Sequence, residues 1–179
     1  MDNKILCHDD FLSTSEFLML QNCILGTPNE NRFSWTWGEN VIDPKIVEES
    51  DVDPLDNYQL FHWVYLQNMY VSTPDISQRM MPIITNKVID VRSLISIKIN
   101  CNTRTSNIVK HGFHNDVENY DSKTGILYMN TCNGYTEFEN GTKVESKANR
   151  FIEFDSGLKH RGTTCTDTKR RVVINLNYF

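Results

Sequence analysis

The sequence lacks the cysteine spacing that marks a disulfide framework or a structural zinc site. Its five cysteines are odd in number, and no two of them form a CxxC motif. They are Cys7, Cys23, Cys101, Cys132 and Cys165. Disulfide-stapled modules carry an even number of cysteines, and zinc knuckles place cysteine pairs close together in sequence. We therefore expect neither, and we interpret Cys101, Cys132 and Cys165 as small buried side chains.

The chain also lacks an excess of positive charge and a long apolar run. Lys and Arg total 18 against 23 for Asp and Glu, which gives a formal net charge of −5. Nucleic-acid coats concentrate Lys and Arg on one face, so this balance disfavours a nucleic-acid substrate. No stretch approaches the roughly 20 apolar residues of a membrane span. The start, Met1-Asp2-Asn3-Lys4, has an acid where a signal peptide is basic. We expect a cytoplasmic protein with no membrane partner, and the oligomeric state stays open.

The length and composition fit one ordinary domain. The chain has 179 residues, of which 39% are hydrophobic and 23% charged. This length is too short for a two-domain enzyme built around a dinucleotide-binding fold, and the apolar content is enough for a core. We expect a single domain over residues 1–179, in which helices and strands of residues 1–90 flank an all-β core at residues 91–179.

Patterns in the first 90 residues predict two helices among strands and loops. Ser13 and Glu16 have the spacing of a capping box, and apolar residues follow at helical spacing, which predicts a helix over 14–25. The alternation over 33–37 predicts a strand, whereas 40–57 is rich in Asp, Glu and Pro and is expected to be a loop. A strand is expected from Gln59 and a second helix over 74–85. The aromatic residues of this half are expected to pack in the core; they are Trp35, Trp37, Phe61, Trp63 and Tyr65.

From residue 91 the segments become short and are separated by turn signals. Alternation over 93–101 predicts a strand that is buried on one face. Further short strands are expected at 113–117, 125–130, 135–138, 150–154 and 170–178. Many short strands at close spacing indicate a sandwich or barrel. The predicted fold class is therefore mainly β, within the α+β group.

The residues His114, Asp116 and His160 are the candidate metal ligands. In an extended segment, side chains two residues apart point to the same side, so His114 and Asp116 converge. A third ligand from another strand, His160, completes two histidines and one carboxylate. This set leaves coordination positions open and is the arrangement of non-haem Fe(II) oxygenases. By itself the HxD pattern is weak, because His114 is equally well read as a surface histidine paired with Asp116.

A basic residue in the last strand strengthens the interpretation. Alternation places Arg171 on one face with Val173, Asn175 and Asn177. If this face is inward, a buried arginine is costly unless an anion neutralises it. A dicarboxylate co-substrate is such an anion, and a guanidinium grips a carboxylate in a bidentate manner. Arg170 is the neighbouring alternative, and register favours Arg171.

An ordered set of motifs resembles a known family. The motifs are His114-x-Asp116, Gly125-Ile-Leu-Tyr128-Met-Asn130, Gly134-Tyr-Thr-Glu137-Phe, Arg150-Phe-Ile-Glu-Phe154-Asp155, His160 and Arg171-x-Val-Ile-Asn175. Together they resemble the 2-oxoglutarate- and Fe(II)-dependent dioxygenases, in the prolyl 4-hydroxylase-like branch of phage and bacterial type. The resemblance covers about residues 91–179. It implies a double-stranded β-helix, a cupin-like jelly-roll, with flanking N-terminal helices.

The resemblance also implies an activity and its site. Fe(II) would be held by His114, Asp116 and His160, and O₂ would be the oxidant. Arg171 would bind the distal carboxylate of 2-oxoglutarate, and Tyr128 would donate a hydrogen bond to it. Asn100 or Arg104 would also touch the co-substrate. The reaction would hydroxylate a C–H bond of a peptide, protein or small molecule, for instance at a prolyl residue, and ascorbate would be an accessory reductant.

Two other readings stay open at this point. A cupin-like metal-binding module or a zinc hydrolase would use the same barrel and ligands without 2-oxoglutarate. Such a protein has no need of a buried Arg171. Related halogenases lack the carboxylate ligand, so the presence of Asp116 favours hydroxylation. His111, three residues before His114, is expected to be a loop residue without a ligand role.

Overall fold

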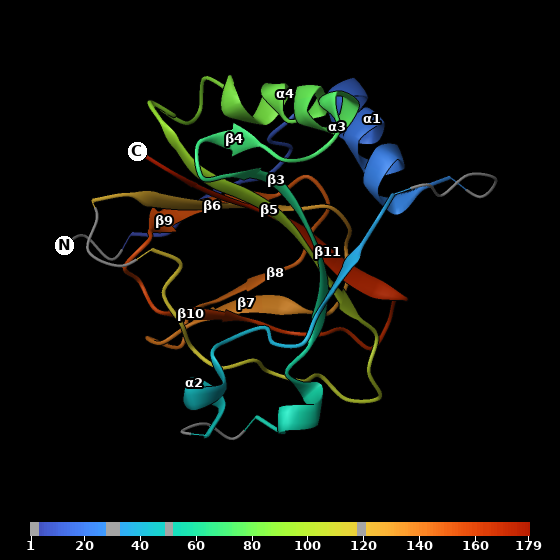
Figure 1. The fold of residues 1–179 in the computed structure, drawn as a ribbon, viewed down its shortest axis with the longest axis vertical. Helices are drawn as coiled ribbons and strands as arrows, with labels where there is room; N and C mark the ends of the chain where they lie inside the picture. The colour runs from blue at the N-terminus through green and yellow to red at the C-terminus, as the bar shows by residue number, and fades with distance from the viewer. Residues whose placement is uncertain (1–3, 28–32, 49–51, 118–120) are drawn as a thin grey trace.

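A computed structural model describes residues 4–27, 33–48, 52–117 and 121–179. Residues 1–3, whose composition is the basis for expecting no signal peptide, lie outside this range. The chain folds into two antiparallel sheets that face one another, with helices on the outer side of the larger sheet (Figure 1). This arrangement is the jelly-roll that the sequence predicts. In the described segments, no helix combines the length and apolar character that a bilayer crossing requires.

The larger sheet contains eight strands. Seven of them follow the order β1-β9-β6-β11-β5-β3-β2, and β4 pairs with β3. Their bounds are β1 Leu6–His8, β2 Thr36–Gly38, β3 Gln59–Leu66, β4 Met69–Tyr70, β5 Leu94–Thr103, β6 Lys123–Tyr128, β9 Phe151–Asp155 and β11 Arg170–Tyr178. The smaller sheet has the order β10-β7-β8, formed by His160–Gly162, Tyr135–Phe138 and Lys143–Glu145. Strands β1, β8 and β10 are too short to give an alternation signal, and the sequence did not predict them.

Helices cover the outer face of the larger sheet. Helix α1 spans Thr14–Leu25 as predicted, with the capping box of Ser13 and Glu16 formed and Gly26 at its end. The predicted second helix is wrong in one respect: it divides into α3, Pro74–Arg79, and α4, Met81–Ile84. Proline has no backbone N–H to continue the helical hydrogen bonding, which explains a break next to Pro82.

The two faces of the larger sheet have different partners. The core under the helices is built from outward residues of β5 and β11 and from apolar helix residues, among them Leu20, Ile24, Met80, Ile83, Ile97, Ile99, Val172, Ile174 and Leu176. A second, smaller core lies between the sheets and contains Ile126, Tyr128, Phe138, Val144, Ile152, Phe154 and Val173. Alternation along β11 therefore separates a packing face from a face directed at the smaller sheet.

Two further expectations for the N-terminal half are wrong. The strand expected over 33–37 is confined to β2, because Phe33 and Trp35 pack against the helix-side core. The segment expected to be a loop over 40–57 contains helix α2, Pro44–Glu48, and a 3₁₀ turn at Pro54–Asp56. A small apolar cluster of Ile42, Val47 and Val52 forms there, and burial of these side chains stabilises the helical turns.

Candidate functional site

The strands of the larger sheet place a row of polar residues on the face between the sheets. Antiparallel pairing sets Arg171 opposite Asn102, Val173 opposite Asn100, Asn175 opposite Lys98 and Asn177 opposite Ser96. Directly paired residues share a face, so all of these side chains point to the same side. They line a cavity of about 270 Å³, together with His111, His114, Asp116, Thr136 and His160.

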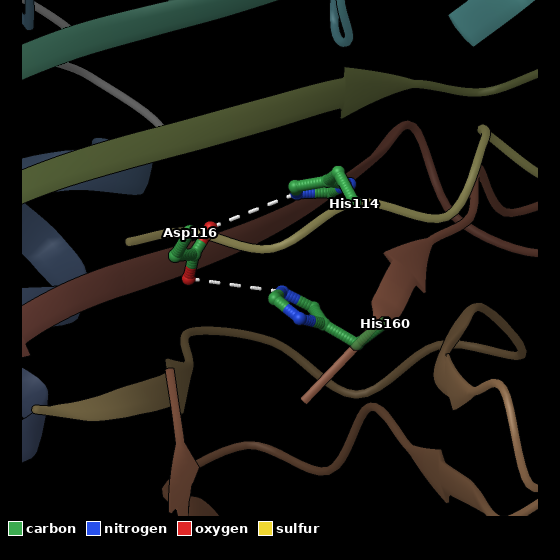
Figure 2. A group of neighbouring side chains, drawn as sticks. All are labelled: His114, Asp116 and His160. Carbon is green, nitrogen blue, oxygen red and sulfur yellow. Dashed lines mark ion pairs between the residues drawn. The ribbon is translucent and has the colours of Figure 1, made fainter. Parts of the chain in front are cut away.

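The three predicted metal ligands meet in this cavity. His114 Nε2 lies 3.6 Å from Asp116 Oδ1, and His160 Nε2 lies 3.7 Å from Asp116 Oδ2 (Figure 2). One ligand atom from each residue lies within 4.8 Å of the other two. The expected strand at 113–117 is absent; instead, an isolated bridge pairs His114 with His160 in β10. This bridge brings the two histidines together although they are far apart in sequence.

Backbone carbonyls orient both imidazole rings toward Asp116. Nδ1 of His114 lies 3.2 Å from the Gly112 carbonyl oxygen, and Nδ1 of His160 lies 3.1 Å from that of Leu158. A carbonyl oxygen only accepts, so each Nδ1 carries the proton in these hydrogen bonds. The lone pair of each Nε2 is therefore directed at the space beside the carboxylate, as in histidines that bind a metal.

The carboxylate of Asp116 is held in its ionised form. Asn175 in β11 donates a hydrogen bond of 2.9 Å from Nδ2 to Asp116 Oδ2. Burial raises the pKa of Asp116, but the nearby charge of His160 and the interactions with His114 and Asn175 outweigh burial, so this pKa lies well below its usual range. Burial also lowers the pKa of His160, and the charge of Asp116 offsets only part of that shift. Burial lowers the pKa of His114 as well, but its hydrogen bond with Asp116 and the charge of that carboxylate outweigh burial, so this pKa lies above its usual value. A cation bound here would meet one ionised carboxylate and would replace a proton on His114.

Arg171 is buried in the same cavity without a carboxylate partner. The side chain is 3% exposed. Its Nε donates to Ser146 Oγ at 2.6 Å and its Nη2 donates to Thr136 Oγ1 at 3.0 Å. Both partners are neutral hydroxyls, and among the described residues no Asp or Glu forms an ion pair with it. Arg170 turns to the helix side, where its Nη2 donates to the Leu25 carbonyl oxygen.

The other residues predicted to bind the co-substrate lie at different depths. Asn100 lines the cavity, and its Oδ1 is buried without a hydrogen-bond partner. Tyr128 is fully buried behind the cavity wall, where its hydroxyl donates to Thr136 Oγ1 at 2.8 Å. Arg104 donates from Nε to the Thr166 carbonyl oxygen and does not line the cavity. The geometry therefore favours Asn100 over Arg104.

Among the residues that line the cavity, His111, Asn175 and Lys98 received no site role from the sequence. His111 is 0% exposed, and both of its ring nitrogens lack a hydrogen-bond partner. Burial, followed by the charges of Arg171 and His114, lowers its pKa to about 4, so the ring is neutral near pH 7. In the sequence, Asn175 and Lys98 stand out only as polar residues within strands that are otherwise largely apolar. In the structure, both faces of these strands are covered. A polar residue at such a position is itself a signal of a cavity.

Comparison with known proteins supports the same fold. No family model matches the sequence, and no curated protein sequence matches it either. Several solved structures match almost the whole chain. A prolyl hydroxylase from Trichoplax adhaerens, solved with a peptide fragment of the hypoxia inducible factor oxygen degradation domain, superposes with a TM-score of 0.60 at 17% identity, covering 99% of this chain and 84% of its own.

Two further structures show the breadth of the likeness. A viral collagen prolyl hydroxylase from Paramecium Bursaria Chlorella virus-1, in complex with 2-oxoglutarate, has a TM-score of 0.54 at 15% identity and covers 98% and 96% of the two chains. The non-haem 2-oxoglutarate-dependent epimerase of nogalamycin biosynthesis has a TM-score of 0.64 at 10% identity and covers 98% and 76%. The chain thus has the double-stranded β-helix fold of the 2-oxoglutarate- and Fe(II)-dependent oxygenases.

Proposed function

We propose that the protein is a 2-oxoglutarate- and Fe(II)-dependent oxygenase. The observation that carries the proposal is Arg171, a buried cation with no anionic partner in the part of the chain that the structure describes, in one cavity with two histidines and a carboxylate. A buried guanidinium is costly without an anion. 2-Oxoglutarate has a carboxylate at one end for Arg171 and a keto acid, which is a metal chelator, at the other. A zinc hydrolase or a simple metal-binding module has no use for this cation.

The residues present fit an iron ion. His114, Asp116 and His160 would hold it, and two histidines with one carboxylate are the ligand set of non-haem Fe(II) oxygenases. When bound, the iron supplies activation of O₂ for attack on a C–H bond, coupled to decarboxylation of 2-oxoglutarate to succinate and CO₂. The protein contributes by fixing the orientation of the three ligands. The carbonyls of Gly112 and Leu158 hold the imidazoles by hydrogen bonds, and Asn175 holds the carboxylate.

Neighbouring residues would position the co-substrate. Arg171 would bind its distal carboxylate, and Ser146 and Thr136 keep the guanidinium in place. Tyr128 does not line the cavity, so it would contribute by donating its hydroxyl hydrogen bond to Thr136, which in turn accepts from Arg171. Asn100 and His111 present unsatisfied polar atoms to the same space. Buried polar atoms without partners are rare. The ring N–H of His111 can donate to an oxygen of the co-substrate, whereas Asn100 Oδ1 only accepts and needs a donor from water or the substrate.

For the substrate, we propose a peptide, a protein or a small molecule that is hydroxylated, with a prolyl residue as the first candidate. Two of the three structures described above are prolyl hydroxylases, and one of these holds a peptide fragment. The epimerase with the same fold supports keeping small molecules in the screen. Ascorbate belongs in the assay as an accessory reductant.

Calorimetry and succinate release test the proposal. The protein loaded with Mn(II) should give heat with 2-oxoglutarate, and with Fe(II), ascorbate and O₂ it should release succinate. Arg171→Met should weaken 2-oxoglutarate binding about a hundredfold, because truncating one partner of a buried charge pair costs about 3 kcal/mol. Arg170→Met is the matched control and should change this affinity less than about threefold.

Three outcomes would contradict the proposal. If Mn(II) binds but 2-oxoglutarate gives no heat, the protein is a metal-binding module or hydrolase on the same barrel. If Asp116→Ala retains metal binding and turnover, the ligand assignment is wrong. If Arg170→Met rather than Arg171→Met removes 2-oxoglutarate binding, the register argument for the anchor is wrong.

A further inference from the structure

One charged residue in the cavity has no role in the proposed function. The residues that line the cavity include three with a formal charge, and they are Lys98, Asp116 and Arg171. Asp116 is assigned to the metal and Arg171 to the co-substrate. Lys98 is a cation in the middle of a strand that is otherwise well buried, and such a residue needs an explanation.

Lys98 lies beside the metal ligands. In β5 it pairs with Asn175 of β11 on one side and with Trp63 of β3 on the other. Asn175 is the residue that donates to Asp116. Lys98 therefore lies opposite the residue that holds the carboxylate ligand, and the charge of Asp116 contributes to its pKa. Its ammonium nevertheless forms no ion pair or hydrogen bond with any of the residues that the structure describes.

Two aromatic rings surround the ammonium in place of an anion. Nζ of Lys98 lies 4.9 Å from the ring centroid of Phe61 and 5.2 Å from that of Trp63. Both rings are partly exposed and belong to neither apolar core, contrary to the expectation of core packing. Cation–π contact stabilises an ammonium but leaves its hydrogen-bond donors free. Burial lowers the pKa of Lys98, and the charge of Asp116 offsets part of that shift.

The charges in the loaded cavity leave one positive charge over. Fe(II) contributes two positive charges and Arg171 one, whereas 2-oxoglutarate contributes two negative charges and Asp116 one. These cancel, and His111 is neutral. Among the described residues, Lys98 then remains as a single uncompensated positive charge in a half-buried position, where partial loss of hydration makes an anionic partner favourable. One further negative charge would compensate it, and neither the metal nor the co-substrate supplies that charge.

We infer that Lys98 binds a carboxylate of the substrate, with Phe61 and Trp63 forming an aromatic wall beside it. The inference rests on the proposed function and narrows its substrate to a molecule that carries a carboxylate near the C–H bond to be oxidised. Depth separates the two cations: Arg171 is buried among hydroxyls, while Lys98 lies with partly exposed aromatic rings. A deep cation suits a co-substrate that binds first, and a shallower one suits a substrate that enters after it.

Phenylacetate and phenylacetamide form a probe pair that measures the effect of a carboxylate charge on binding. Both carry a ring for the aromatic wall, and only the first carries a carboxylate. With the protein saturated in Mn(II) and 2-oxoglutarate, so that the Arg171 site is filled, phenylacetate should bind at least about tenfold more tightly, as a charge-assisted hydrogen bond gives. Lys98→Met should abolish the preference without changing 2-oxoglutarate affinity, and Lys98→Arg should keep it. Lys169→Met, at an exposed lysine, is the control and should bind both probes like the unmodified protein.

Several results would overturn the inference. Equal binding of the two probes, or no binding of phenylacetate, would show that the cavity does not select a carboxylate. A preference that survives in Lys98→Met would place the carboxylate elsewhere. A loss of 2-oxoglutarate affinity in Lys98→Met would assign Lys98 to the co-substrate. If the unmodified protein binds neither Mn(II) nor 2-oxoglutarate, the proposed function itself fails, a result that is distinct from all of these.

Discussion

The carboxylate of Asp116 depends on a neighbour that binds no metal. Asn175 donates to Asp116 Oδ2, and its own Oδ1 accepts from Asn177 Nδ2 at 3.1 Å. Asn177 in turn donates to Ser96 Oγ at 3.1 Å. A chain of polar residues along β11 therefore fixes the one charged ligand, and residues of this kind tune metal affinity in many metalloproteins.

Replacing Asn175 should weaken metal binding without unfolding the protein. Asn175→Ala removes the hydrogen bond to Asp116, so the carboxylate loses its fixed orientation. We expect Mn(II) affinity to fall about 10- to 100-fold, measured by calorimetry at pH 7.5. Asn115→Ala is a matched control, because Asn115 lines the cavity but donates to the Gly157 carbonyl oxygen. Equal losses in the two variants would contradict the role given to Asn175.

His111 should make the metal-free protein less stable in mild acid. Its pKa is about 4 in the folded state against 6.5 in an unperturbed side chain. Between these values the unfolded chain takes up the proton and the folded protein does not, so stability falls as pH decreases from about 6.5 to about 4. The loss between pH 7 and pH 5 amounts to about 2 kcal/mol.

Urea unfolding at the two pH values measures this loss. His111→Gln cannot titrate, so the pH dependence of its unfolding free energy should be smaller than that of the unmodified protein by about 2 kcal/mol. His8→Gln is a control at a residue outside the cavity. If His111→Gln keeps the full pH dependence, the buried ring is not the titrating group.

At the scale of elements, the close contact of β6 with β9 limits what the sheet accepts. A Cβ atom at Gly125 would lie 2.4 Å from Cζ of Phe151. Phe151 is 0% exposed, and its ring stacks on Phe11 at a centroid distance of 4.2 Å. The ring has no free space to move into, so glycine at this strand position is a packing requirement.

Gly125→Ala should therefore destabilise the protein. We expect a loss of about 1 to 3 kcal/mol in unfolding free energy, the range for overpacking a core. Gly157→Ala is the control, because Gly157 is exposed and a Cβ there meets only the flexible Asp155 side chain, at 3.2 Å. Its unfolding free energy should change by less than about 0.5 kcal/mol. If the two variants have the same midpoint in urea, the contact with Phe151 does not limit the strand.

At the scale of the whole molecule, the site joins three separate parts of the fold. His160 belongs to the smaller sheet, Arg171 and Asn175 to the larger one, and His114 and Asp116 to the loop between β5 and β6. A metal and a co-substrate that bound all three parts, as proposed, would stabilise only the folded state. Their binding free energy adds to the stability of the whole chain.

Ligands should therefore raise the thermal midpoint. At a hundredfold excess of ligand over its dissociation constant, the gain is about 2.7 kcal/mol. For a chain of this size each kcal/mol raises the midpoint by about 2 to 4 °C. Mn(II) followed by 2-oxoglutarate should give two successive rises in a melting scan, and EDTA should reverse both. For Arg171→Met only the first rise is expected; a second rise of normal size would contradict its role.

How far the sequence predicts the architecture depends on how strong the local signals are. The bounds of α1, β7 and β11 follow from a capping box and from clear alternation. The short strands β1, β8 and β10 have three residues each and form because a partner strand is already in place. That residues 1–179 form one domain stays a prediction, which the pairing of β3 with β5 supports.

The sequence by itself singled out the groups to which the proposed chemistry is assigned. His114, Asp116, His160 and Arg171 are visible as residue types in an order and register that few other functions require. Only the tertiary structure decided what surrounds them. Whether a polar residue faces water or a cavity depends on the elements that pack over it. Neither Lys98 in β5 nor His111 in the loop that follows could therefore be assigned a role from the sequence. Buried atoms without partners exist only after folding, and these atoms point to the co-substrate and the substrate.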